Sequence, residues 1–220
     1  MEATIGYIRK ETFIQRLVGR KTFWGLVCTL LFAYPIYRSM NRTLSPELPV
    51  YSSLPSFSFT NDFGKAFGSI QLKGKIYFVS FTNADYINSH PKVMKTLRVI
   101  QKRMRGVRNE ASHISITTKP TVDNDKVLHV LARKLQANPF YWSFLTGENS
   151  VDFINQNFKP LMVEQNLIKK DASIDDLVNL NKIVLVDRIG QVRGFYSMDK
   201  HSVNTLMINV GLLMNRKNQK

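Results

Sequence analysis

From Ser56 onward, short apolar runs that suit buried strands alternate with longer segments of helical periodicity. An alternation of this kind restricts the chain to a layered α/β fold, because each helix must cover the sheet that its neighbouring strands build. The runs that predict strands are FSFT at 57–60, IYFVSF at 76–81, HISITT at 113–118, YWSFLTG at 141–147, IVLVD at 183–187 and VRGFY at 192–196.

The predicted helices separate these strands. One amphipathic helix over 90–107 carries its apolar side chains on one face and its basic side chains on the other. A second helix follows Asp123 or Asn124 as N-cap, a short one covers 150–158, and a last one runs from Val203 to about Met214. Strand, helix and strand, followed by a late hairpin and a terminal helix, fit a thioredoxin-like α/β sandwich.

Before this domain lies TFWGLVCTLLFAYPIY, sixteen residues without a charge. A helix of that length spans about 24 Å, somewhat less than a hydrocarbon core of ~30 Å, and flanking basic and aromatic side chains can close the gap. A cleaved signal peptide and a buried soluble helix are the alternatives. We therefore predict a single N-terminal transmembrane helix at 22–38, after a basic segment at 1–21 and before a linker at 39–55, with the domain at 56–220.

Basic residues are unevenly distributed around this apolar segment, with five before it and two, Arg38 and Arg42, after it. The positive-inside rule then places the N-terminus in the cytosol or the mitochondrial matrix and the domain across the membrane. We expect a single-pass protein of the mitochondrial inner membrane whose domain faces the intermembrane space. A bacterial inner membrane, with the domain in the periplasm, is the alternative.

The amino-acid composition limits both the sites that the chain can form and the partners that it can bind. The chain has one cysteine, Cys28, which excludes an intrachain disulfide and a site with two thiolates. The formal net charge is +15, but the excess is spread along the chain, which argues against nucleic acid and favours acidic proteins or anionic lipid as partners. One basic helix face is a candidate docking surface, although such a face can also be merely solvated; it comprises Arg98, Lys102, Arg103, Arg105 and Arg108.

Several segments resemble, in order, the Sco/SenC family of membrane-tethered thioredoxin-like proteins. They are SFSFTNDFGK, LKGKIYFVSFT, HPKVMKTL, WSFLTG and LVDRIGQVRGFY, with a looser match at KPTVDNDKVL, and together they cover about Ser56 to Met214. The resemblance implies copper delivery to cytochrome c oxidase. It also implies a copper site made by two cysteines, four residues apart and each followed by proline in the family pattern, and a distant histidine.

This chain departs from the family at all three of those positions. Aligned on HPKVMKTL, the cysteine positions fall on Tyr86 and His90; aligned on the preceding FT, they fall on Ala84 and Asn88. The first alignment keeps the proline, the methionine and the leucine of the family segment, so we prefer it. The distant histidine falls on Asn179. The resemblance therefore implies a degenerate member.

Copper(I) needs thiolate, thioether or imidazole ligands, and thiol–disulfide exchange needs a thiolate. We therefore predict no catalytic, cofactor-binding or metal-binding residues, no enzyme activity, and a polar loop over 83–90 in which His90 is a helix N-cap. The expected role is an accessory subunit or assembly partner of cytochrome c oxidase. Its partners would be oxidase subunits or other respiratory-complex proteins and membrane lipid such as cardiolipin. A copper chaperone with a non-standard ligand set is the alternative.

Overall fold

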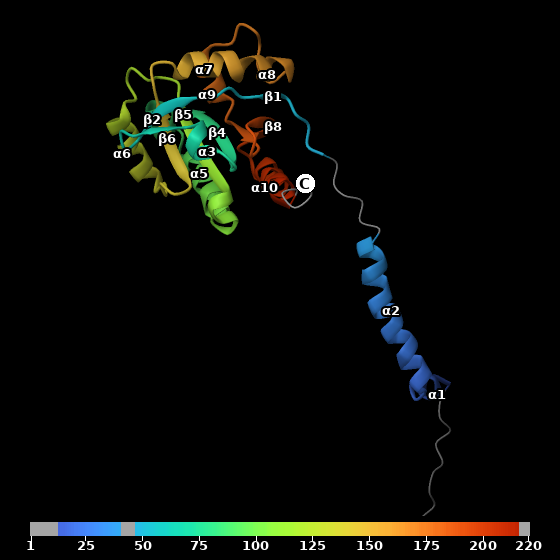
Figure 1. Cartoon of the computed structure of the whole chain (residues 1–220). Coiled ribbons are helices and arrows are strands. Elements are labelled where there is room, and N and C mark those ends of the chain that lie inside the picture. Colours follow the sequence, from blue (N-terminus) through green and yellow to red (C-terminus); the bar gives the residue numbers. More distant parts are fainter. Residues whose placement is uncertain (1–12, 41–46, 216–220) are drawn as a thin grey trace, which may run out of the picture. The chain divides into compact units, whose positions relative to one another are not determined.

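The computed structural model describes residues 13–40 and 47–215, which form two units divided after Pro46; each unit is described by itself (Figure 1). The first unit holds helix α1 (Phe13–Val18) and helix α2 (Lys21–Met40). The indole Nε1 of Trp24 donates to the carbonyl of Val18 across the turn between them, at 2.9 Å. Part of the predicted basic segment, residues 1–12, lies outside the described residues.

Helix α2 covers the segment predicted to be helical at 22–38 and is solvent-exposed along its length. The helix is therefore confirmed, but not its predicted ability to span: none of the helices at 13–40 or 47–215 is long and apolar enough to cross a membrane. The reason lies in the sequence. The charge-free run has sixteen residues, and aromatic residues with polar atoms and Pro35 dilute its apolar character.

The second unit is built on one mixed sheet, in the order β1-β8-β7-β4-β5-β6-β2-β3. Strands β4, β5 and β6 are parallel, and the other pairs are antiparallel. The six predicted strands are all present, with ends shifted by up to two residues; the sequence missed β1 and β3, which are only two and three residues long. The strands are β1 (Ser52–Ser53), β2 (Ser58–Asn61), β3 (Ala66–Gly68), β4 (Ile76–Thr82), β5 (Ala111–Thr117), β6 (Trp142–Thr146), β7 (Lys182–Val186) and β8 (Gln191–Ser197).

Helices cover both faces of this sheet, as Figure 1 shows. On one face α7, α8 and α9 pack on a core that includes Phe81, Ile116 and Val184. On the other face α5, α6 and α10 enclose two further apolar clusters, and every residue of β4 and β5 is buried between the layers. The helices are α3 (Ser69–Leu72), α4 (Ala84–Ser89), α5 (Pro91–Met104), α6 (Asp125–Leu135), α7 (Ser150–Asn157), α8 (Lys159–Glu164), α9 (Ile174–Asn179) and α10 (Lys200–Asn215), and a 3₁₀ turn, η1, covers Arg105–Glu110.

The structure differs from the sequence prediction in three segments. Residues 47–55, predicted as linker, belong to the second unit, because β1 pairs with β8 and Leu54 N donates to the Gly190 carbonyl at 2.9 Å. The segment predicted as a polar loop at 83–90 is largely helix α4. Helix α10 begins at Lys200, three residues earlier than predicted, after Asp199 accepts hydrogen bonds from the first-turn backbone.

A row of polar side chains lies inside the parallel part of the sheet. The hydroxyl of Ser80 on β4 lies 2.9 Å from Nε2 of His113 on β5 and 2.8 Å from the hydroxyl of Ser115, which accepts from the indole of Trp142. The Trp142 ring stacks on the imidazole at a centroid distance of 4.7 Å. Burial lowers the pKa of His113 from 6.5 to about 3, because the charged imidazolium would lose its water.

This histidine predicts a specific loss of stability in mild acid. The unfolded chain binds a proton near pH 6.5 and the folded chain only near pH 3, so the contribution is complete above pH 6.5 and is lost as the pH falls toward 3. The free energy of unfolding should fall by up to about 1.4 kcal/mol per pH unit. Denaturant melts of the full chain between pH 7 and about 4.5, above the usual range of carboxyl groups, measure this slope.

The slope should largely disappear in His113→Gln and remain in His201→Gln, which replaces an exposed histidine. Asp62, whose pKa burial raises, keeps its partner His129 in all three proteins, so its contribution cancels in the comparison. An unchanged slope in His113→Gln would contradict the prediction.

Candidate functional site

The site lies where parallel strands β4 and β5 end. Asn83 follows β4 and caps helix α4, with its side-chain oxygen accepting from Tyr86 N at 2.7 Å. The carboxylate of Asp123, which is buried, accepts from Ala84 N at 3.1 Å and from the Thr117 hydroxyl at 2.6 Å. Asp123 therefore fixes the start of α4 against the end of β5. It does not cap α6, where Asn124 accepts from the backbone instead.

Tyr86 and His90 lie one helical turn apart and form a stacked pair. Their ring centroids are 3.9 Å apart with an interplanar angle of 21°, and His90 Nδ1 lies 2.7 Å from the Tyr86 carbonyl oxygen. His90 occupies the N-cap position of α5, as predicted, but its side chain makes no capping hydrogen bond. The imidazole therefore packs back on α4 and does not satisfy the backbone of α5.

Helix α9 and the residues after it form the opposite wall. Ser173 and Asp176 make a capping box at its start, and the hydrogen bonds from Ser173 hold the pKa of the Asp176 carboxyl below its usual value. At its end, Asn181 adopts a left-handed conformation with φ of 50°. Its amide pairs with the Tyr86 hydroxyl, through its nitrogen at 2.8 Å and its oxygen at 3.1 Å.

The three predicted family positions line one cleft between these walls. Its volume is about 290 Å³, and Tyr86, His90 and Asn179 all contribute to its lining. An ion pair between Lys119 and Asp175, at 4.0 Å, lies at the same cleft. The positions of the other alignment, Ala84 and Asn88, line a different groove between α4 and α6. The geometry therefore groups Asn179 with the first alignment alone.

Comparison with known proteins shows the family of the chain. A family model described as SCO1/SenC matches residues 48–211, which is well over half of the chain. The chain belongs to the SCO1/SenC family. No curated protein matches it significantly.

Solved structures of Sco proteins match the fold. A SCO1/SenC family lipoprotein from Bacillus anthracis has a TM-score of 0.63 at 22% identity, covering 77% of this chain and 99% of that one. BsSco, described as a member of the Sco family of cytochrome c oxidase assembly proteins, has a TM-score of 0.57 at 18% identity, covering 78% and 98%. Yeast Sco1 with copper bound has 0.51 at 20% identity, covering 73% and 94%. The predicted thioredoxin-like α/β class is confirmed.

The donor atoms in the cleft of this SCO1/SenC protein do not suit copper. They are one imidazole, one phenol, the Ser89 hydroxyl, the amides of Asn83 and Asn179, and two carboxylates, of which Asp175 is already paired with Lys119. Copper(I) prefers thiolate, thioether and imidazole, and the chain's single cysteine, Cys28, lies in α2. Within residues 13–40 and 47–215 no group of three or more His, Cys, Asp or Glu side chains could hold a metal ion.

The structure also divides the predicted docking surface. Two of its cations have internal partners, since the Arg98 guanidinium donates to the carbonyls of Leu135 and Lys134 at the end of α6, and Arg103 donates to Asn204 of α10. Lys102 and Arg105 are exposed. Arg108 lies in the turn η1, and its side chain lies outside the described residues. Arg98 and Arg103 therefore tie helices together.

Sequence reasoning missed the two asparagines that shape the cleft. Asn83 directly follows an apolar run, and asparagine is among the residues preferred as a helix N-cap. Asn181 precedes β7, and asparagine is among the residues that tolerate the left-handed conformation. The partner of Asn181, however, lies across the fold: Tyr86 is 95 positions away in the sequence, which gives no local signal.

The shared cleft predicts that copper binding can be restored. The triple variant Tyr86→Cys, His90→Cys and Asn179→His, made with Cys28→Ser, places two thiolates and an imidazole around one space. Titration under reducing conditions against a chromogenic copper(I) chelator should show one copper(I) bound per chain.

The matched control is Ala84→Cys, Asn88→Cys and Asn179→His in the same background. It has the same residue types and the same spacing between the cysteines, but its thiolates face α6. We therefore expect it to compete only weakly with the chelator for copper(I). Equal copper binding by the two triple variants, with both folded by circular dichroism, would contradict the geometry.

Proposed function

We propose that this SCO1/SenC protein is a non-catalytic accessory subunit or assembly partner of cytochrome c oxidase. Two relatives support the choice of partner: BsSco belongs to a family of cytochrome c oxidase assembly proteins, and yeast Sco1 binds copper. The single observation that carries the proposal is the state of the cleft. It is lined by the positions to which the resemblance assigns the copper ligands, and its side chains are bonded to one another.

Those internal bonds connect α4 with α9 and the residues that follow it. The Tyr86 hydroxyl bonds Asn181, the Tyr86 ring stacks on His90, and Lys119 reaches Asp175. A copper carrier needs soft ligands that are free to take up and release the metal. A protein that acts by contact needs a stable surface instead, and these bonds provide one.

Helix α5 offers the charged part of that surface. It carries five basic residues and no acidic one, and its apolar side is buried in the domain. After Arg98 and Arg103 are assigned to internal bonds, Lys102 and Arg105 remain exposed at its C-terminal end. The partner that complements them is an acidic protein surface, with electrostatic attraction speeding the encounter.

The proposed place of action is the mitochondrial inner membrane, with the domain on the intermembrane-space side. Support comes from the description of one relative as a lipoprotein and from the match to a yeast protein. Helix α2, with its exposed Leu26, Leu30 and Phe32, gives the chain an apolar segment suited to a membrane environment.

The alternative, a copper chaperone with a non-standard ligand set, has His90 as its only soft ligand in the cleft. The position of the cleft favours the chaperone role, whereas the scarcity of soft ligands in the cleft argues against it. We therefore retain it only as the hypothesis that the following experiments must separate from the contact role.

Charge reversal at the end of α5 should weaken association with the oxidase. Lys102→Glu combined with Arg105→Glu replaces two attractive contacts by repulsive ones, and we expect a loss of affinity of roughly tenfold or more, reduced at high salt. Co-purification from gently solubilised membranes at two salt concentrations measures it. Thermal unfolding should be unchanged, because both side chains are exposed.

Lys169→Glu with Lys170→Glu is the matched control, since it makes the same charge change at exposed positions after α8. His90→Ala separates the two roles. The contact role predicts normal association and normal oxidase activity in His90→Ala. Loss of oxidase activity that added copper restores would instead establish the chaperone role.

A further inference from the structure

A second groove lies at the opposite end of the sheet from the candidate site. It has a volume of about 490 Å³ and lies between the α3 turn and the β7–β8 hairpin; we call it the hairpin groove. Two isoleucines on its rim are unusually exposed, Ile70 at 85% and Ile189 at 70%. Exposed aliphatic side chains that share one groove indicate a surface that binds a membrane or another apolar partner.

The turns that present these isoleucines are held firmly. Both oxygens of the buried Asp187 carboxylate are used: one accepts from Ile189 N at 3.0 Å and from Gln191 N at 2.9 Å, and the other pairs with Arg193 at 2.7 Å. Gly74 N donates to the Arg188 carbonyl at 3.3 Å, which joins the α3 turn to the hairpin. The isoleucines are therefore fixed in position before any partner binds.

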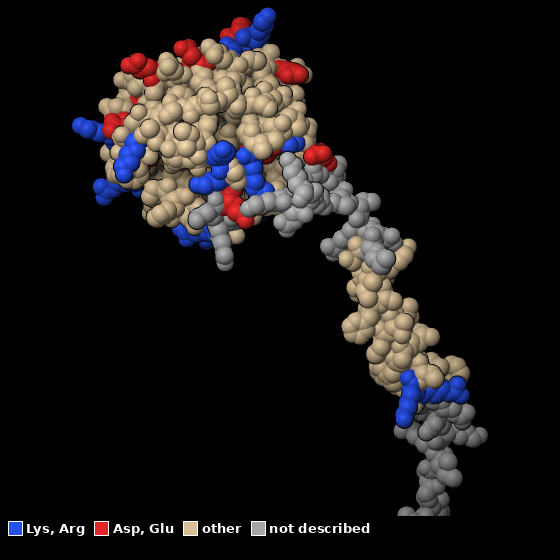
Figure 2. Space-filling view, in the orientation of Figure 1, with Lys and Arg blue, Asp and Glu red and all other residues tan. Residues whose placement is uncertain are grey.

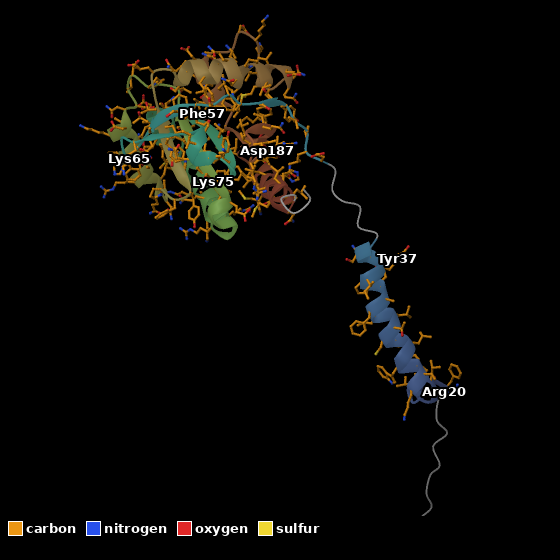
Figure 3. All side chains as sticks on the ribbon, viewed as in Figure 1. Arg20, Tyr37, Phe57, Lys65, Lys75 and Asp187 are labelled. Atoms are coloured by element: carbon orange, nitrogen blue, oxygen red, sulfur yellow. The ribbon has the colours of Figure 1, made fainter. Side chains whose placement is uncertain are left out.

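The charge around the groove is basic. Lys73 lies on its rim, Lys75 follows two residues later, and Arg188 lines it while paired with Glu110. Figure 3 labels Lys75 and Asp187 on the side of the domain facing the viewer, and Figure 2 shows several blue side chains gathered over the same area around one red one. Aliphatic side chains flanked by lysines suit the interface of an anionic bilayer.

The path of the chain favours a membrane over a protein as the occupant. The Arg193 guanidinium, which pairs with Asp187 in this hairpin, also donates to the Leu48 carbonyl at 2.9 Å, so the polypeptide enters the domain beside the hairpin. Only six residues, 41–46, precede the second unit after helix α2 with its exposed apolar side chains. A chain of that length reaches at most about 25 Å, so a bilayer that bound α2 would be tethered within that distance of the hairpin.

We propose that the hairpin groove is a membrane-docking surface, on which Ile70 and Ile189 enter the interface of an anionic bilayer and Lys73 and Lys75 contact its phosphate groups. This surface shares no residue with the cleft at Tyr86 or with Lys102 and Arg105, so it does not depend on the oxidase role. It fixes the orientation of the domain, with the β4–β5 ends and the candidate site directed away from the lipid.

The test uses single cysteines in the full chain with Cys28→Ser, each labelled with a polarity-sensitive fluorophore. Ile70→Cys and Ile189→Cys report on the groove. Val122→Cys and Val130→Cys are the matched controls: they are aliphatic and 59% and 67% exposed, Val122 follows β5 near the candidate site, and Val130 lies on α6. The measurements are emission wavelength and quenching by aqueous iodide, with vesicles of phosphatidylcholine with and without phosphatidylglycerol.

With phosphatidylglycerol vesicles, the labels at 70 and 189 should shift to shorter wavelength and resist iodide, while those at 122 and 130 remain accessible. Adding Lys73→Glu and Lys75→Glu should abolish the shift. The proposal fails if all four labels respond alike, if 70 and 189 stay accessible, or if phosphatidylcholine alone gives the full effect. It also fails if protection occurs without vesicles, which would indicate a second copy of the chain, or with inorganic phosphate alone.

Discussion

The parallel pairing of β4 with β5 is the constraint on which the rest of the domain depends. The two strands pair over seven residues, from Ile76 opposite Ala111 to Thr82 opposite Thr117, and both are buried on both faces. Because the strands are parallel, their carboxyl ends meet at one edge, and the loops that follow must be ordered there. The buried carboxylate of Asp123 provides that order by bonding the ends of both strands, so α4 starts at a fixed point.

This construction explains how the fold can hold a cleft at this edge whichever side chains line it. Folding requires the strand ends, the Asp123 bonds and the start of α4, and none of these involves the side chains of Tyr86, His90 and Asn179. Substitution at those positions removes soft ligands without disturbing the scaffold. In this chain the side chains at two of these positions contribute to the scaffold: Tyr86 bonds Asn181 across the cleft, and His90 stacks on Tyr86.

The sequence predicted this domain well where the signal was periodic. The six longer strands and the amphipathic helices α5 and α6 follow directly from apolar spacing, and a few motifs suffice for the family. Prediction failed where a single distant partner decides the outcome. The predicted docking surface on α5 looked uniform in the sequence, yet Arg98 and Arg103 are hydrogen-bonded to α6 and α10. Helix α4 was read as a loop, because its polar residues gave no periodicity and its Asn83 cap was overlooked.

We propose that this SCO1/SenC protein supports cytochrome c oxidase by contact and carries no copper to it. The most direct test is the copper-to-haem ratio of oxidase purified from cells that lack the chain, compared with oxidase from cells that contain it. We predict less assembled oxidase, or oxidase of lower activity, with an unchanged copper-to-haem ratio and no rescue by added copper. Copper-deficient oxidase that added copper restores would contradict the account.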